Sequence, residues 1–170
     1  MSYAEDLLSL ARTLVELEPT RPKQATLRRA VSTAYYAVFH LLTYEGARRL
    51  IGGKQNHSPL RGTVRRAFSH VEMRQAAAGF ASGNLSPKLD AVLDAGTVPQ
   101  ELRRFAETFV NLRADRHVAD YDWNARFTRS QAADIVAATE KAFVDWEVIR
   151  KTEPARVFLV ALLLLRSIRQ

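Results

Sequence analysis

The spacing of the apolar residues is the feature that most constrains how this chain folds. Apolar side chains recur at intervals of three or four residues in almost every segment, and no segment sustains the alternation of apolar and polar residues that marks a half-buried strand. Ser2 and Glu5, for example, have the spacing of a capping box at the start of an apolar helical stripe. The pattern therefore predicts an all-α protein.

Glycine and proline divide this pattern into segments. The Gly52-Gly53 pair ends a long helical pattern, and Pro59 and Pro99 lie where further helices are expected to begin. Six helices are predicted, over residues 2–18, 23–51, 58–80, 99–118, 128–151 and 153–170. The connection over 121–127 is expected to be a loop. Such segments indicate an up-and-down bundle of four or five helices with one further apolar helix at the C-terminus.

The last predicted helix is unusually apolar. Val157 to Leu165 is a run of nine apolar residues between Arg156 and Arg166. Because a membrane-spanning helix needs about 20 such residues, we expect a buried helix and no membrane association. The run is apolar around most of the helix, so we expect a second copy of the chain to cover its outer side. The 170 residues then form one domain, with a bundle over 1–152 and a packing and dimerisation helix over 153–170.

The charge of the chain is strongly positive, and cysteine is absent. The net charge is +7, and residues 61–74 contain four arginines (Arg61, Arg65, Arg66 and Arg74) against one acid, Glu72. Basic stretches attract polyanions, so nucleic acid is the expected class of partner, although a basic surface can also serve solubility alone. Without cysteine there is no disulfide, thiolate metal site or cysteine nucleophile, which fits a protein of the reducing cytoplasm.

Several common sites are missing from the sequence. None of the four histidines lies three residues after a glutamate, as in di-iron bundles, and no Gly-x-x-x-x-Gly-Lys or Gly-x-Gly-x-x-Gly phosphate-binding motif occurs. We therefore expect neither a metal nor a nucleotide cofactor. The two tryptophans, Trp123 and Trp146, are expected to anchor packing rather than to stack on bases.

Polar residues form a second stripe on the helix predicted over 23–51. Arg29, Ser32, Tyr36 and His40 are spaced by three or four residues beside an apolar face. Such residues either bond to one another within the bundle or line a site, and their spacing leaves both interpretations open.

A denser polar group lies near residue 118, where another helix is predicted to end. Arg113, His117 and Asp120 are spaced i, i+4 and i+7, so they share one face if the helix extends that far. An arginine can hold a phosphate while a histidine one turn later moves the proton of an attacking 2′-hydroxyl, as metal-independent RNA cleavage requires. In the alternative, His117 complements the helix dipole and Arg113 pairs with Asp120 or Asp115.

Two motifs together resemble the HEPN superfamily of small helical-bundle proteins. One is Arg29-Ala-Val-Ser-Thr-Ala-Tyr-Tyr-Ala-Val-Phe-His40, the other is Leu112-Arg-Ala-Asp-Arg-His-Val-Ala-Asp-Tyr-Asp122, and the similarity covers about residues 1–150. The resemblance implies a four-to-five-helix bundle, often dimeric, with the polar motif near the dimer cleft. Many members are metal-independent ribonucleases of toxin or defence systems, encoded beside a nucleotidyltransferase-type partner protein, whereas others are non-catalytic binding modules.

The resemblance also implies roles for single residues. Arg113 and His117 correspond to the catalytic arginine and histidine, and Arg29 and Arg116 would supply charge to bound RNA. The residues expected to support the site structurally are Tyr36, His40, Asp120 and Tyr121. Active members place four to six residues between arginine and histidine, whereas this chain has three, and one residue fewer turns a helix by about 100°. We expect an RNA- or nucleotide-associated protein, either a ribonuclease with a variant motif or a non-catalytic homodimeric module.

Overall fold

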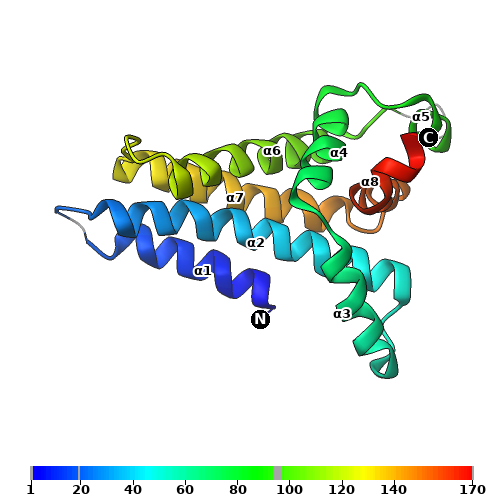
Figure 1. Cartoon of the computed structure of the whole chain (residues 1–170), viewed down its shortest axis with the longest axis horizontal. Coiled ribbons are helices and arrows are strands. Elements are labelled where there is room, and N and C mark those ends of the chain that lie inside the picture. The colour runs from blue at the N-terminus through cyan, green and yellow to red at the C-terminus, as the bar shows by residue number, and fades with distance from the viewer. Residues whose placement is uncertain (1, 19, 94–96, 170) are drawn as a thin grey trace. The chain divides into compact units, whose positions relative to one another are not determined.

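The computed structural model describes residues 2–18, 20–93 and 97–169. These residues form eight α-helices and one 3-10 helix, with no strand among them, which confirms the predicted all-α class (Figure 1). The helices are α1 (Tyr3–Glu16), α2 (Gln24–Ile51), the 3-10 helix η1 (Gln55–His57), α3 (Ser58–Ala67), α4 (His70–Ser82), α5 (Pro87–Val92), α6 (Gln100–Tyr121), α7 (Arg129–Ile149) and α8 (Glu153–Arg169). No helix in this part of the chain is both long and apolar enough to cross a membrane.

The helices gather into two compact units. The first comprises Met1–His40 and Thr108–Val144, and the second comprises Leu41–Glu107 and Asp145–Gln170. Helices α2, α6 and α7 each contribute one part to each unit. The description of residues 1–170 as a single domain, with 153–170 as its dimerisation helix, stays a prediction.

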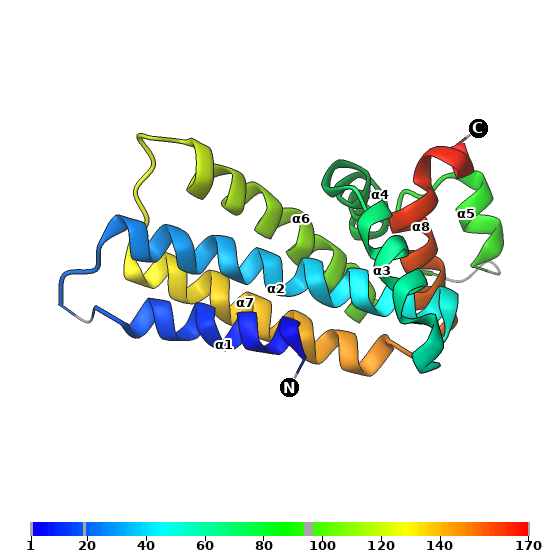
Figure 2. The same ribbon diagram turned by 60° about the horizontal axis from the view of Figure 1, so that its bottom comes forward.

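The first unit is an up-and-down arrangement of four helical segments. They come from α1, α2, α6 and α7, and successive segments run in opposite directions (Figure 1, Figure 2). The capping box predicted at the start of α1 is present, since Ser2 Oγ accepts a hydrogen bond from the Glu5 backbone and the Glu5 carboxylate accepts one from the Ser2 backbone. Between α2 and α6, the rings of Tyr35 and Phe109 stack with their centroids 5.7 Å apart.

The connection between α6 and α7 is held by an arginine of α2. Arg28 donates hydrogen bonds to the backbone carbonyls of Ala119, Asp122 and Ala125, at 3.0, 2.7 and 2.6 Å. Carbonyls at a helix end have no partner within the helix, so the bond to Ala119 stabilises the last turn of α6, and the other two bonds hold the connection that follows it. The helix accordingly continues beyond residue 118, where it was expected to end.

The second unit has its core between α8 and the helices α4 and α5. Phe158 of α8 meets the Phe80 ring of α4 edge to face, with centroids 5.0 Å apart. Six of the nine residues in the run from Val157 to Leu165 are buried within the unit, and Leu164 is the one that is 43% exposed. Most of the surface expected to face a second copy is therefore covered by the same chain, and dimerisation through this helix stays a prediction.

The helix predicted over 58–80 is in fact two helices, α3 and α4. The chain leaves helical geometry at Phe68, whose φ of −71° and ψ of 122° are extended. The break turns the Phe68 ring into the core against Gly46 of α2, where an added Cβ would lie only 2.5 Å from the ring. Apolar spacing did not reveal this break because Phe68 continues the helical spacing from Val64.

The two tryptophans have opposite environments. Trp146 is fully buried in the second unit, with its ring centroid 5.1 Å from that of Phe105, so its predicted packing role is confirmed. Trp123 is 92% exposed in the connection after α6, so the same prediction is wrong there. Hydrogen bonds from the Arg28 guanidinium to backbone carbonyls, rather than burial of an aromatic ring, hold that connection.

Candidate functional site

All of the predicted site residues lie in the first unit, on α2 and on the last three turns of α6. Because α6 continues to Tyr121, the condition for Arg113, His117 and Asp120 to share one helical face is met. His117 is exposed, and Arg113 is half-buried. Neither side chain has a hydrogen-bond or ion-pair partner among the described residues. Arg113 and His117 are thus accessible, and their polar groups are not used in packing.

Arg116, by contrast, has polar partners on both α2 and α6. Its Nη2 donates a hydrogen bond to the Tyr36 hydroxyl at 2.9 Å, and its Nε lies 2.6 Å from Asp120 Oδ2. The other carboxylate oxygen of Asp120 accepts a hydrogen bond from the buried Ser32 hydroxyl. The resulting network, which we call the Arg116 network (Ser32, Tyr36, Arg116 and Asp120), joins α2 to α6.

Aromatic rings enclose the guanidinium of this network on two sides. Arg116 Cζ lies 5.5 Å from the centroid of the Tyr36 ring and 5.4 Å from that of the Tyr121 ring, within the range of cation–π attraction. Burial alone would lower the pKa of Arg116, but Tyr36 and Asp120 stabilise the charged form and hold this pKa above its usual value. Arg116 therefore stays charged, and its charge is already balanced within the fold.

The ion pair expected between Arg113 and Asp120 or Asp115 is not the one observed. Asp120 pairs with Arg116, one turn away at i,i+4, whereas Arg113 lies two turns away at i,i+7. Asp115, two residues from Arg113, belongs to a different helix face. It lines a groove of about 240 Å³ with Asp134 of α7, and burial raises the pKa of its carboxyl.

His117 has an aromatic neighbour one turn further along the helix. The His117 and Tyr121 rings have centroids 5.1 Å apart at an interplanar angle of 46°. Tyr121 is 59% exposed, and it is followed by the almost fully exposed Trp123. This end of α6 therefore presents an imidazole and two aromatic side chains to solvent beside the half-buried Arg113.

The stripe predicted on α2 divides between surface and interior. Arg29 is exposed, Ser32 is buried, and Tyr36 and His40 are partly buried. The His40 ring meets the Tyr3 ring edge to face at 4.9 Å and lies 6.3 Å from the Tyr36 ring. The three residues of the stripe that follow Arg29 in the sequence thus pack within the bundle.

Two features of this region were not predicted. Arg28 was not singled out, although it binds the connection after α6, and the exposure of Trp123 was not expected. An arginine at the edge of an apolar helical face is the signal that could have identified Arg28. The sequence held no comparable signal for Trp123.

Neither a cluster of metal ligands among the described residues nor a match to a known protein helps to identify the function. In the part of the chain that the structure describes, no three histidine, cysteine or acidic side chains come close enough together to hold a metal ion. Comparison of the chain with models of protein families, with curated proteins and with solved structures found no match.

Proposed function

We propose that the protein is an RNA-associated factor of HEPN type in which Arg113 and His117 act on the phosphodiester backbone. The observation that carries this proposal is the contrast among the three basic residues at the end of α6. Arg116 is balanced by Asp120 and Tyr36, whereas Arg113 and His117 share a face and have no hydrogen-bond or ion-pair partner among the described residues. A phosphate is the natural partner for that remaining pair of donors.

In this proposal the two residues divide the work of a metal-independent cleavage. The guanidinium of Arg113 binds the non-bridging oxygens of the scissile phosphate and stabilises the charge that develops there. His117 takes the proton of the neighbouring 2′-hydroxyl, whose oxygen bonds to phosphorus as the bond to the 5′-oxygen breaks. The leaving 5′-oxygen takes up a proton from solvent water, and the products are a 2′,3′-cyclic phosphate and a 5′-hydroxyl. The two side chains project from one face with about 6 Å between their Cβ atoms.

The neighbouring aromatic side chains support RNA as the substrate class. Tyr121 and Trp123 are exposed beyond His117, and bases of single-stranded RNA stack on such rings. The rest of the proposal comes from the HEPN resemblance: a homodimer, a nucleotidyltransferase-type partner protein, and a role in a toxin or defence system. We propose the cytoplasm as the location because the chain has no cysteine.

A second candidate function is a non-catalytic homodimeric interaction module. It is favoured by the Arg116 network, because this network uses polar residues of both HEPN-like motifs to join α2 to α6. In that case the motifs persist for packing, and Arg113 and His117 are surface residues without a reaction to perform.

A cleavage assay with a mixed RNA pool in the presence of a metal chelator separates the two functions. Wild type is compared with His117→Ala and Arg113→Ala, and with His70→Ala, which removes an exposed histidine from α4. A ribonuclease predicts loss of cleavage in the first two variants only, with 2′,3′-cyclic phosphate ends on the wild-type products. If folded wild type leaves the pool intact, or if His117→Ala cleaves as fast as wild type, the catalytic proposal is wrong and the interaction module replaces it.

A further inference from the structure

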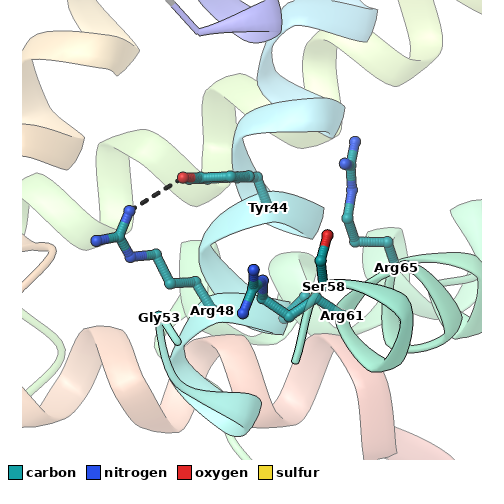
Figure 3. A pocket seen from close by; sticks show the side chains of 8 residues that line it. Tyr44, Arg48, Gly53, Ser58, Arg61 and Arg65 are labelled. Carbon is teal, nitrogen blue, oxygen red and sulfur yellow. Dashed lines mark hydrogen bonds between the residues drawn. The ribbon is translucent and has the colours of Figure 1, made fainter. Parts of the chain in front are cut away.

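The second unit contains a pocket of about 280 Å³ between the end of α2 and α3 (Figure 3). Its lining includes Tyr44, Arg48, Gly53, Ser58, Arg61 and Arg65. No acidic residue is among the described residues that line it. The three arginines come from two helices, so the fold and not the sequence alone brings them together.

The three arginines are positioned without any carboxylate. Arg48 Nη1 donates to the Tyr44 hydroxyl at 3.0 Å, and Arg61 Nη1 donates to two backbone carbonyls of the loop after α2, at 3.0 and 2.7 Å. In the described part of the chain, Arg48, Arg61 and Arg65 have no ion pair with an acidic side chain. Three uncompensated like charges around one pocket repel one another, and a bound anion relieves that repulsion.

The donors that remain match a phosphate. Arg61 uses only Nη1 in its two bonds, Arg48 uses only Nη1 in its bond to Tyr44, and Arg65 uses none. Figure 3 shows the Ser58 hydroxyl and the Arg65 side chain pointing to the same side of α3, whereas the Arg61 guanidinium reaches toward the loop after α2. Planar guanidinium groups bind phosphate oxygens in pairs, which gives arginine its preference for this ligand.

The surroundings of the pocket suit a chain of phosphates better than a single one. Arg48 and Gly53 also line a larger groove of about 660 Å³, whose other described lining residues include Arg49, Lys151 and a single acid, Glu45. Basic lining thus continues beyond the pocket, as the backbone of a nucleic-acid strand requires. Tyr44 is 40% exposed at the pocket, so its ring is available to a base.

We propose that this pocket binds a backbone phosphate of single-stranded RNA through Arg48, Arg61 and Arg65. The site lies in the second unit and involves none of the residues assigned to cleavage. It deepens the proposed RNA association, on which it rests, and it applies equally to a ribonuclease and to a non-catalytic RNA-binding protein. The phosphate of a free nucleotide has the same chemistry, and the experiment separates these two sources.

The test is binding of a fluorescent 12-nucleotide RNA to the full chain carrying Arg48→Gln and Arg65→Gln. Neither substitution removes an ion pair, and Arg61 is left to hold the loop. The matched control is Arg74→Gln with Arg103→Gln, which removes the same charge from two exposed residues of the second unit outside the pocket. We expect the pocket variant to bind the RNA at least about tenfold more weakly than the control, and the slope of log affinity against log salt to fall in magnitude by about 0.7, because one phosphate contact is lost.

Three outcomes overturn the proposal. Equal RNA affinity of the pocket variant and its control would show that the pocket does not bind RNA. Failure of the wild type to bind the 12-mer at ~50 mM salt would show the same. Adenosine 5′-monophosphate bound as tightly as the 12-mer, with the same loss in the pocket variant, assigns the site to a free nucleotide instead of a strand. RNA cleavage is measured separately in both variants, so a failure of this site is distinguishable from a failure of the Arg113–His117 site.

Discussion

Tyr36 and Tyr44 lie on the same helix, and each accepts a hydrogen bond from an arginine. Only one of these two arginines also forms an ion pair with an acidic side chain among the described residues. Arg116, which binds Tyr36, also pairs with Asp120 at 2.6 Å. Arg48, which binds Tyr44, lies in a pocket whose described lining holds two more arginines and no acid. The first arrangement is complete within the protein and the second is not. An arginine is therefore assigned to structure or to binding by the charge that faces it, and not by its hydrogen bond to a tyrosine.

The largest effect that tests this comparison is the loss of each tyrosine ring. Tyr36→Ala removes ring contacts with Arg116 and His40 as well as the hydrogen bond, so we expect a loss of about 3 kcal/mol in the free energy of unfolding. Tyr44→Ala removes a 40% exposed ring, and we expect a loss of less than about 1 kcal/mol. Urea unfolding of both variants measures the difference. Equal losses would show that the two tyrosines have the same role and would break the comparison.

A smaller difference is expected between the two arginines of α6. Arg116→Ala leaves the Asp120 carboxylate without its cation, so we expect a loss of about 2 kcal/mol, as for a hydrogen bond to a charged group. Arg113→Ala removes no such partner, and its loss should stay within about 0.5 kcal/mol. Thermal and urea unfolding of the two variants provide the measurement. A loss of 2 kcal/mol or so in Arg113→Ala would assign Arg113 to packing and weaken the proposed phosphate contact.

The sequence predicted these regions to the extent that their contacts lie within one helix and not between helices. Contacts within one helix were accessible: the capping box of α1 and the shared face of Arg113 and His117 follow from spacing alone. The pairing of Arg116 with Asp120 also lies within one helix, but its preference over Arg113 depends on Tyr36 and Ser32 of α2. Residue spacing contains no information about which side chains another helix presents.

The pocket in the second unit shows the same limit more strongly. The basic stretch over 61–74 is evident in the sequence, and it indicated nucleic acid as a partner class. The sequence did not indicate that Arg61 and Arg65 line one pocket with Arg48, because this depends on how α3 packs beside the end of α2. It also depends on the break at Phe68 that ends α3. The apolar spacing predicts one continuous helix across this position.

The smallest expected effect concerns an uncompensated charge of the opposite sign in the first unit. Asp115 has no ion-pair partner among the described residues, and burial raises the pKa of its carboxyl, so the folded protein binds this proton more tightly than the unfolded chain does. The stabilisation by that proton is complete below the unfolded pKa of about 3.9 and is lost as the pH rises through the higher pKa of the folded state.

Asp115→Asn does not titrate. We therefore expect it to be more stable than wild type at pH 7 by less than about 0.5 kcal/mol, with this advantage disappearing below about pH 3.5. Asp134→Asn removes the same charge from an exposed residue of the same groove and should gain less, because an exposed carboxylate keeps its hydration. An equal gain in both variants, measured by urea unfolding across this pH range, would show that repulsion between the two carboxylates, and not burial of Asp115, sets the cost.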